Sequence, residues 1–214
     1  MTAREALAAG IDTLGLEVDD AAQAKLLAYI ALLEKWNRTH NLTAIRDPER
    51  MVTHHLLDAL ATLPHLGQRP ALRVLDVGSG GGVPGVPLAI ARPDWRVTLL
   101  DSNRKKAAFL RQAVAEVPLP NVVVAATRVE DYVSEAQFDV AISRAVAELS
   151  TFVAATRRLV RAGGCLMAMK GVHPGKELAK LPDDVRVVAV PALDVPGVEG
   201  ERHLVIMEAG GGAK

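Results

Sequence analysis

An acidic residue followed by closely spaced glycines is the part of this chain whose residue types and spacing best fit a chemical role. Asp76 stands two residues before a Gly-x-Gly-x-Gly pattern that begins at Gly78. The largely apolar, β-branched run Arg73–Val77 predicts a buried strand, and Val86–Ala91 predicts a helix. Glycines let the backbone approach a ligand, and a helix start presents unpaired N–H groups to it. The segment therefore predicts a site for a nucleotide-like ligand.

The spacing of the glycines distinguishes several kinds of site. A dinucleotide fingerprint, Gly-x-Gly-x-x-Gly, would need a glycine where Val83 stands. A phosphate-binding P-loop would need Gly-Lys-Ser/Thr at its end, and this segment has no lysine. A Gly-x-Ser-x-Gly nucleophile elbow would need a glycine where Val77 stands. An acid followed by Gly-x-Gly-x-Gly after a strand instead resembles motif I of the class I S-adenosylmethionine-dependent methyltransferases.

A second acid follows the next predicted strand. The strand Trp95–Leu100 ends at Asp101, which lies 25 residues after Asp76. Parallel nucleotide-binding sheets hold a ribose diol with an acid at this place, about 20 residues past the glycines. The alternative for Asp101 is a helix N-cap that it would share with Ser102, and the two roles are compatible.

Composition limits the classes of protein and partner. The 214 residues fit one large domain with a small appendage, and 25 basic against 25 acidic residues give no net charge. Nucleic-acid binding would therefore depend on local patches. Cys165 is the only cysteine, which excludes a disulfide framework and a thiolate metal cluster. Without a signal peptide or an apolar run of ~20 residues, we expect a cytoplasmic protein with no membrane partner.

Strand and helix patterns alternate from residue 72 onward. Strands are predicted near 72–77, 96–100, 121–126, 138–142, 164–169, 184–190 and 203–208, and helices near 84–92, 103–117, 147–161 and 175–180. Such alternation builds an α/β fold with a mostly parallel sheet of seven strands. Only Pro191–Arg202 joins the last two strands, without a helix, so the last strand is predicted to be antiparallel.

Residues 1–69 are predicted to form a small helical cap before a ligand-binding domain at 70–210. A short helix within 1–16 precedes a longer one at 21–37 whose N-cap comes from Val18-Asp19-Asp20, and a third covers about 48–63 with proline in its first turn. His54 and His55 would point about 100° apart on that helix, which argues against a metal site. We expect one of them to make a hydrogen bond to a loop.

Further runs make the resemblance specific to one family. In chain order they are Leu33-Glu34-Lys35-Trp36-Asn37, Asn41-Leu42-Thr43-Ala44-Ile45, His55-Leu56-Leu57-Asp58, Asp76–Pro87, Leu99-Leu100-Asp101-Ser102, Arg128-Val129-Glu130, Phe138-Asp139, Ser143-Arg144-Ala145, Lys170-Gly171 and Glu201-Arg202-His203. They resemble the bacterial small-subunit rRNA guanine-N7 methyltransferases, the glucose-inhibited division protein B family. The resemblance covers residues 20–208, with mild departures at Ala59, Gly81 and Val83.

This resemblance implies a class I S-adenosylmethionine-dependent methyltransferase fold, Rossmann-like, with an N-terminal helical cap. It implies S-adenosylmethionine as the cofactor and N7 of a guanine in 16S rRNA of the 30S subunit, in the decoding region, as the methyl acceptor. Carried over to this chain, the cofactor-binding positions are Asp76, Gly78, Gly80, Val83, Asp101, Ser102, Val129, Glu130 and Arg144. The glycines and Val83 are expected at the methionine end, Asp101 at the ribose, and Val129 with Glu130 around the adenine. An ordinary loop is the alternative for the last two.

The chemistry that the chain lacks fits a ring nitrogen as the acceptor. Enzymes that methylate exocyclic amines usually carry Asp/Asn-Pro-Pro-aromatic where this chain has Ser143-Arg144-Ala145. Methylation of pyrimidine C5 needs a nucleophilic cysteine, whereas Cys165 fits a small core residue. Guanine N7 carries its own lone pair, so positioning, which supplies up to ~7–11 kcal/mol in well-oriented reactions, can provide most of the catalysis.

Two basic residues at strand ends are the candidate catalytic residues. Arg144 offers bidentate contact to guanine O6 or to a phosphate, or a contact to the cofactor carboxylate, and its alternative is an ion pair with Asp139 or Glu148. Lys170 is similarly placed to meet a phosphate, and its alternative is a solvated turn lysine. The candidate RNA contacts are Lys35, Arg38, Arg104, Lys105 and Arg202, for which a merely solvated face is the alternative.

Two other functions remain open at this point. The absence of net charge favours a methyltransferase for a small molecule or a protein. A protein that binds the cofactor or RNA without catalysis is the second alternative. We expect a monomer that needs no metal.

Overall fold

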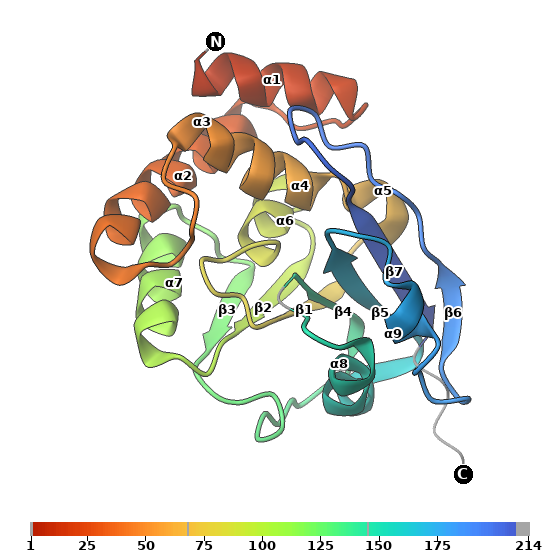
Figure 1. Ribbon diagram of the computed structural model, residues 1–214. Helices are drawn as coiled ribbons and strands as arrows, with labels where there is room; N and C mark the ends of the chain where they lie inside the picture. Colours follow the sequence, from red (N-terminus) through yellow and green to blue (C-terminus); the bar gives the residue numbers. More distant parts are fainter. Residues whose placement is uncertain (1, 68, 145, 209–214) are drawn as a thin grey trace.

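The computed structural model describes residues 2–67, 69–144 and 146–208 and centres on a mixed sheet (Figure 1). Ala145, the last residue of the Ser143-Arg144-Ala145 run, and residues 209–214, which include the predicted domain limit, lie outside the described residues. The strands are β1 Arg73–Val77, β2 Arg96–Leu100, β3 Val122–Ala125, β4 Phe138–Ser143, β5 Val160–Lys170, β6 Arg186–Ala189 and β7 His203–Glu208.

Within these residues the sheet has seven strands in the order β3-β2-β1-β4-β5-β7-β6. The first five strands pair in parallel, and β7 runs antiparallel to both β5 and β6. The predicted mostly parallel sheet with an antiparallel last strand is therefore confirmed. Val77 pairs with Leu100, and Leu100 pairs with Ala125, so the loops that follow β1, β2 and β3 leave the sheet side by side.

The helices cover both faces of the sheet (Figure 1). They are α1 Ala3–Thr13, α2 Asp20–His40, α3 Pro48–Met51, α4 Asp58–Leu60, α5 Leu63–Leu66, α6 Gly85–Ala91, α7 Arg104–Glu116, α8 Leu149–Thr156 and α9 Gly175–Leu178. The N-terminal helices lie over α6 and α7. One apolar cluster joins Leu7 and Leu33 of these helices to Leu99 of β2 and Leu110 of α7. A smaller cluster packs α8 against the other face. None of the described helices is both long and apolar enough to cross a bilayer.

The third predicted helix, residues 48–63, is interrupted. Asp47 caps its start through a 3.0 Å hydrogen bond from the Glu49 N–H, as Asp19 caps α2 through Ala22. After α3 the backbone widens into a π-helical segment at Val52–Leu57 before α4 continues. Such segments are rare and frequently lie at functional sites. This segment carries His54 and His55 and delivers Asp58 at its end.

The predicted helix at 147–161 is too long. Helix α8 ends at Thr156, a short 3₁₀ turn follows, and β5 begins at Val160 instead of residue 164. Gly163 has a φ of 71°, and a Cβ on Gly164 would lie 2.7 Å from the Asp139 carbonyl oxygen. The β4–β5 register shifts at the same place. The glycine pair thus forms an irregularity inside the strand rather than its start.

Candidate active site

The glycine turn after β1 is fastened to the end of β2. The N–H groups of Gly78 and Ser79 donate to the Leu100 carbonyl at 2.8 and 3.1 Å. Gly82 has a φ of 92°, and a Cβ there would lie 2.7 Å from the Val86 Cγ2 atom. Both the backbone conformation and the close packing against α6 therefore require glycine. The Tyr29 hydroxyl of α2 donates to the Gly81 carbonyl, which links the N-terminal helices to the turn.

Asp101 holds this turn from the neighbouring strand. Its Oδ2 atom accepts the Gly80 N–H at 2.8 Å, and its Oδ1 atom accepts the Asn103 N–H at 2.8 Å. Asn103, instead of Asp101 with Ser102, is the N-cap of α7, because its side chain accepts from Lys105 and Lys106. Asp101 therefore acts on the helix only through Asn103. Each of its oxygens retains lone-pair capacity for a further donor.

Asp76 lies beneath the turn, fully buried. Its Oδ2 atom accepts the N–H of Gly85, the first residue of α6, at 2.9 Å. Its Oδ1 atom has no hydrogen-bond partner among the described residues. Burial raises the pKa of Asp76 to about 7. The carboxyl group thus fixes the start of α6 from below and stands behind the glycine turn.

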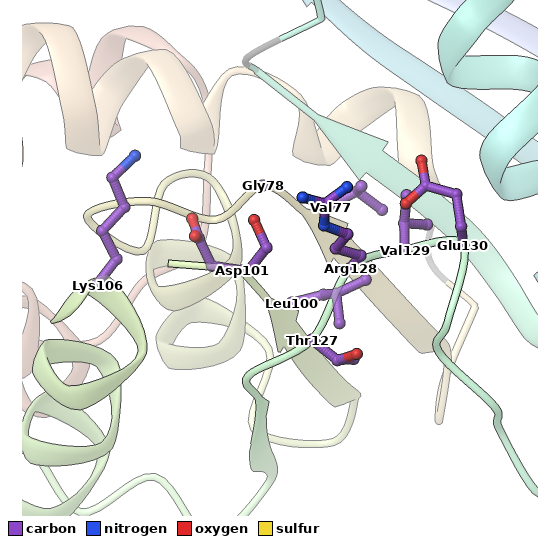
Figure 2. A pocket seen from close by; sticks show the side chains of 10 residues that line it. Val77, Gly78, Leu100, Asp101, Lys106, Thr127, Arg128, Val129 and Glu130 are labelled. Atoms are coloured by element: carbon purple, nitrogen blue, oxygen red, sulfur yellow. The ribbon is translucent and has the colours of Figure 1, made fainter. Parts of the chain in front are cut away.

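A pocket of about 450 Å³ opens where the loops after β1, β2 and β3 meet (Figure 2). We call it the β1–β3 pocket. Its lining residues are Val77, Gly78, Leu100, Asp101, Ser102, Lys106, Thr127, Arg128, Val129 and Glu130. Five predicted cofactor residues, Gly78, Asp101, Ser102, Val129 and Glu130, are thus brought together.

Four other predicted cofactor residues, Asp76, Gly80, Val83 and Arg144, stand outside this lining. Val83 is buried in the core at 4% exposure, and Gly80 faces Asp101. Figure 2 shows the Arg128 side chain extending from its loop toward the glycine turn. Neither Arg128 nor Lys106 was predicted for this site, although each adjoins a predicted residue in the sequence.

The β1–β3 pocket fits a nucleoside-bearing cofactor. Its volume lies in the range of about 300–1,000 Å³ that is typical of ligand pockets. Leu100 and Val129 offer apolar surface, Asp101 offers acceptors for ribose hydroxyls, and a Cβ on Gly78 would meet no atom within 4 Å. The open space at Gly78, where φ is 70°, is available to a ligand that approaches the backbone.

A second pocket of about 380 Å³ lies between the N-terminal helices and the ends of β4, β5 and β7. We call it the arginine pocket. Its lining residues are Thr43, Ala44, Ile45, His54, His55, Asp58, Arg144, Met169, Lys170, Gly171, Leu193, Arg202 and His203. Three predicted residues, Arg144, Lys170 and Arg202, meet here. Of the others, Asp58 and His203 appeared only within the motifs that carry the family resemblance.

Arg144 is fixed by the π-helical segment. Its guanidinium donates to the His54 carbonyl and contacts the His55 Nδ1 atom, both at 3.0 Å, and lies 3.8 Å from Asp58. The alternative partners, Asp139 and Glu148, pair with other residues, so that expectation is wrong. Arg144 therefore faces the pocket with partners from the N-terminal helices.

His55 makes the loop hydrogen bond that the sequence predicts for one of the two histidines. Its Nε2 atom lies 2.9 Å from the Thr43 hydroxyl. Burial and the charge of Arg144 lower the pKa of His55 to about 4, so the ring is neutral at pH 7. Its Nδ1 atom lies 3.0 Å from two groups, the Arg144 guanidinium, which only donates, and the His54 carbonyl, which only accepts. A proton on Nε2 therefore pairs Nδ1 with Arg144, and a proton on Nδ1 pairs it with His54. Among the described residues, no three His, Cys, Asp or Glu side chains are placed to hold a metal ion.

Lys170 is held on all sides. Its ammonium donates to Glu177 and to the Val146 carbonyl at 2.8 Å, and to the Ala147 carbonyl at 3.4 Å. Glu177 in turn accepts the N–H of Leu149 at 3.0 Å. The Lys170 side chain is 11% exposed, so the alternative of a solvated turn lysine is wrong. Lys170 joins the end of β5 to the start of α8 and to α9.

The predicted RNA contacts divide into two groups. Lys35, Arg38, Arg104 and Lys105 lie on α2 and α7, away from the arginine pocket. These helices pack antiparallel, because the start of α2 meets the end of α7 (Lys25 to the Pro118 carbonyl, 3.3 Å) while Trp36 meets Phe109. The end of α2 therefore lies near the start of α7. Arg202 stands apart, because it lines the arginine pocket.

The strand order, the glycine turn and the acid at the end of β2 define a class I S-adenosylmethionine-dependent methyltransferase. The glycopeptide N-methyltransferase MtfA, solved with S-adenosylmethionine, has this fold, with a TM-score of 0.58 and 14% identity over 72% of this chain and 94% of that chain. TrmN from Thermus thermophilus gives a TM-score of 0.55 and 19% identity over 70% of this chain and 47% of that chain.

The family model described as rRNA small subunit methyltransferase G matches residues 22–205. The ribosomal RNA small subunit methyltransferase G of Neisseria meningitidis (serogroup A, strain Z2491) is 54% identical over 207 residues, which cover 97% of this chain and 99% of the relative. The same enzyme from Nitrosospira multiformis is 50% identical over 96% of this chain and 97% of its own length. The chain belongs to this family, so the resemblance predicted from its motifs is confirmed.

Proposed function

We propose that this protein transfers a methyl group from S-adenosylmethionine to N7 of a guanine in 16S rRNA. The observation that carries the proposal is the family match over residues 22–205. The two pockets support it, because one fits a nucleoside-bearing cofactor and the other combines cationic and apolar groups in a space suited to a base. An rRNA substrate implies a cytoplasmic enzyme, and we propose that it acts as a monomer.

The β1–β3 pocket is the proposed cofactor site. Asp101 and Ser102 are assigned to the ribose, Val129 and Glu130 to the adenine, and Gly78 to the methionine end. Asp76, Gly80 and Val83 are assigned to shaping the glycine turn, because their contacts run to the protein itself. When bound, S-adenosylmethionine supplies an electrophilic methyl group carried on a sulfonium.

Guanine N7 needs no deprotonation, so the chain has to position the base. Arg144 is the proposed residue for this role, since its guanidinium is held at three points beside the arginine pocket. His55 is neutral at pH 7, which leaves it no role as a cation, and its Nδ1 atom adjoins Arg144. Lys170 is assigned a positioning role through the segment before α8. Orientation of this kind contributes up to ~7–11 kcal/mol in favourable systems.

The cations of α2 and α7 form the proposed surface for rRNA phosphates. Lys35, Arg38, Arg104 and Lys105 gather where the end of α2 approaches the start of α7. Phosphate contacts supply affinity without sequence selection, which would leave selection to the pocket. A local patch also accommodates a chain with no net charge.

Labelled methyl transfer tests the proposal. The acceptors are 16S rRNA and 30S subunits from a strain that lacks the gene, with a protein extract and a small-molecule extract as controls. We expect label in the rRNA or the 30S subunit, released as 7-methylguanosine on nuclease digestion. Label found only in protein or small molecules would overturn the proposal in favour of another methyltransferase function.

A further inference from the structure

The arginine pocket contains two buried polar atoms that lack hydrogen-bond partners among the described residues. They are the Oδ1 atom of Asp58 and the Nδ1 atom of His203. Asp58 is 4% exposed and His203 is 9% exposed, and both line the pocket. Buried polar groups in native proteins are nearly always paired, so an exception within a pocket indicates groups kept for a ligand.

Two arginines flank Asp58 without satisfying it. The Nε atom of Arg202 lies 3.3 Å from Oδ1 in an ion pair that lacks the alignment of a hydrogen bond, and the Arg144 guanidinium lies 3.8 Å from Oδ2. Both guanidiniums are bonded elsewhere, to the carbonyls of His54 and Glu201. Burial raises the pKa of Asp58 above its usual value, and the charges of the two arginines oppose this shift. The carboxylate thus offers acceptor capacity at the edge of the pocket.

A carboxylate with a purely structural role has a different environment in this molecule. Asp139, at the start of β4, accepts the Arg73 N–H at 2.8 Å and the Arg161 Nε–H at 2.7 Å, and each oxygen is thereby paired. Burial opposes the charge of Asp139, yet these hydrogen bonds lower its pKa overall. Asp76 also has an unpaired Oδ1 atom, but it lines neither pocket, whereas Asp58 presents its vacant acceptor at the wall of the arginine pocket.

We propose that the arginine pocket receives the target guanine by its Watson–Crick edge, with Asp58 accepting the N1–H and the exocyclic N2 amine. This assignment rests on the proposed function and specifies how the base is selected. Arg202, whose Nε atom lies 3.3 Å from Asp58, and His203, which lines the same pocket, are assigned to guanine O6. Ile45, Met169 and Leu193 supply apolar surface to the base.

The donor pattern of guanine matches this arrangement. Guanine alone among the four bases presents N1–H and an N2 amine side by side, and an ionised carboxylate only accepts. Adenine presents an acceptor at N1, which a carboxylate would repel. Enzymes that modify a base commonly read its Watson–Crick edge in a pocket. N7 lies on the opposite edge of the purine, so this binding mode leaves N7 free to react.

A double-mutant cycle between the protein and the base tests the assignment. The substrates are 30S subunits whose ligated 16S rRNA carries guanosine or inosine at the methylated position, and inosine lacks only the N2 amine. The enzymes are the wild type, Asp58→Asn, Asp58→Ala and, as a matched control, Asp184→Ala. Asp184 is exposed and pairs with Arg157, so this control removes another carboxylate that faces an arginine. The measurement is kcat/KM for methyl transfer.

We expect inosine to lower kcat/KM of the wild type and of Asp184→Ala by roughly tenfold or more, the usual size for removing a hydrogen bond to a charged group. In Asp58→Ala the guanosine-to-inosine ratio should fall close to one. This ratio is taken within one enzyme preparation, so it does not depend on the fraction that is folded. Any intrinsic effect of the amine on N7 reactivity is common to all the enzymes, so it cancels when the ratio of one enzyme is divided by that of another.

Three results would overturn the assignment. If inosine and Asp58→Ala each lower the rate and their effects multiply independently, Asp58 only orients the arginines. If the wild type does not distinguish inosine from guanosine, the amine is not read. Both results leave rRNA methylation intact, whereas a wild type that transfers no methyl to the guanosine substrate would overturn the proposed function as well.

Discussion

The β1–β3 pocket and the arginine pocket differ in the kinds of groups that form them. The β1–β3 pocket is formed by the loops that directly follow three neighbouring parallel strands. Its shape is fixed by hydrogen bonds that backbone N–H groups donate, from Gly78 to the Leu100 carbonyl and from Gly80 to the Asp101 carboxylate. The arginine pocket draws on the loop after α2, the π-helical segment and the ends of three strands, and its contacts join charged side chains.

This difference predicts different roles for the two sites. A pocket shaped by backbone groups can bind any ligand that carries the same nucleoside, and substitutions of side chains change its shape little. A frame of side-chain charges is selective, because each group must find a matching donor or acceptor. The glycine turn is held by Tyr29 of α2 and by Asp101, so it connects the N-terminal helices to the β1–β3 pocket. Predictions that perturb one pocket and leave the other intact therefore test this division most directly.

The largest effect is expected on stability, from Asp76, which lies beneath the glycine turn of the β1–β3 pocket. Burial raises the pKa of Asp76 from 3.8 to about 7 in the folded protein. Between these values the unfolded chain releases the proton while the folded state keeps it, so stability falls as the pH rises from about 4 to 7. The fall amounts to at most about 4 kcal/mol. Asp76→Asn should not show this fall in stability. Urea unfolding of both proteins at pH 5 and pH 8 measures it. Equal pH trends in both proteins would contradict a buried neutral carboxyl.

Replacing Arg144 should affect the arginine pocket alone. We expect Arg144→Ala to lower kcat on the order of 10²-fold, since small misplacements of reacting groups cost that much. The affinity for S-adenosylmethionine, measured by calorimetry, should stay near the wild-type value, because Arg144 does not line the β1–β3 pocket. Arg161→Ala, which breaks the Asp139 pair at the other end of β4, is the matched control. A large loss of cofactor affinity would instead assign Arg144 to the cofactor carboxylate.

The same division explains what the sequence could predict. Asp76, Gly78 and Asp101 could be predicted to lie close together because each stands at or next to a strand end, and parallel strands bring such ends together. The antiparallel β7 followed from the missing helix before it. Roles for Asp58 and His203 were not predicted, because the pocket that joins them depends on how β7 pairs with β5 and where the N-terminal helices dock.

The irregularities of the backbone were also not predicted from the sequence. The apolar spacing of residues 48–63 fits an α-helix, and side-chain pattern alone does not reveal the π-helical segment Val52–Leu57. That segment aims the His54 carbonyl and the His55 ring at Arg144. The alternative partners for Arg144, Asp139 and Glu148, both lie within five residues of it in the sequence. The structure replaces them with Asp58, which tertiary packing brings near.

Replacing Asp101 should affect the β1–β3 pocket alone. Asp101→Asn removes the charged acceptor that we assign to the ribose, so the Kd for S-adenosylmethionine should rise roughly tenfold or more. The Kd for 30S subunits should change little. Asp94→Asn, an exposed carboxylate near the opposite end of β2 that pairs with Arg92, is the control and should bind the cofactor normally. Unchanged cofactor binding in Asp101→Asn would remove the ribose assignment.

The smallest effect concerns the surface outside both pockets. Removing one phosphate contact should reduce the slope of log K against log salt by roughly 0.7–0.9. We therefore expect Arg104→Gln combined with Lys105→Gln to weaken 30S binding at low salt and to flatten its salt dependence. Lys176→Gln combined with Lys180→Gln, at and beside α9 on the other side of the molecule, removes the same charge (Figure 1).

The two double variants separate a local patch from a general charge effect. If rRNA contacts the surface where α2 meets α7, only the α7 variant changes the slope, and the kcat at saturating substrate is the same in both. If overall charge alone governs binding, both variants change the slope equally, because each lowers the net charge by two. Equal slopes would therefore contradict a specific phosphate-binding surface on α2 and α7. Recognition of the rRNA would then depend on the arginine pocket alone.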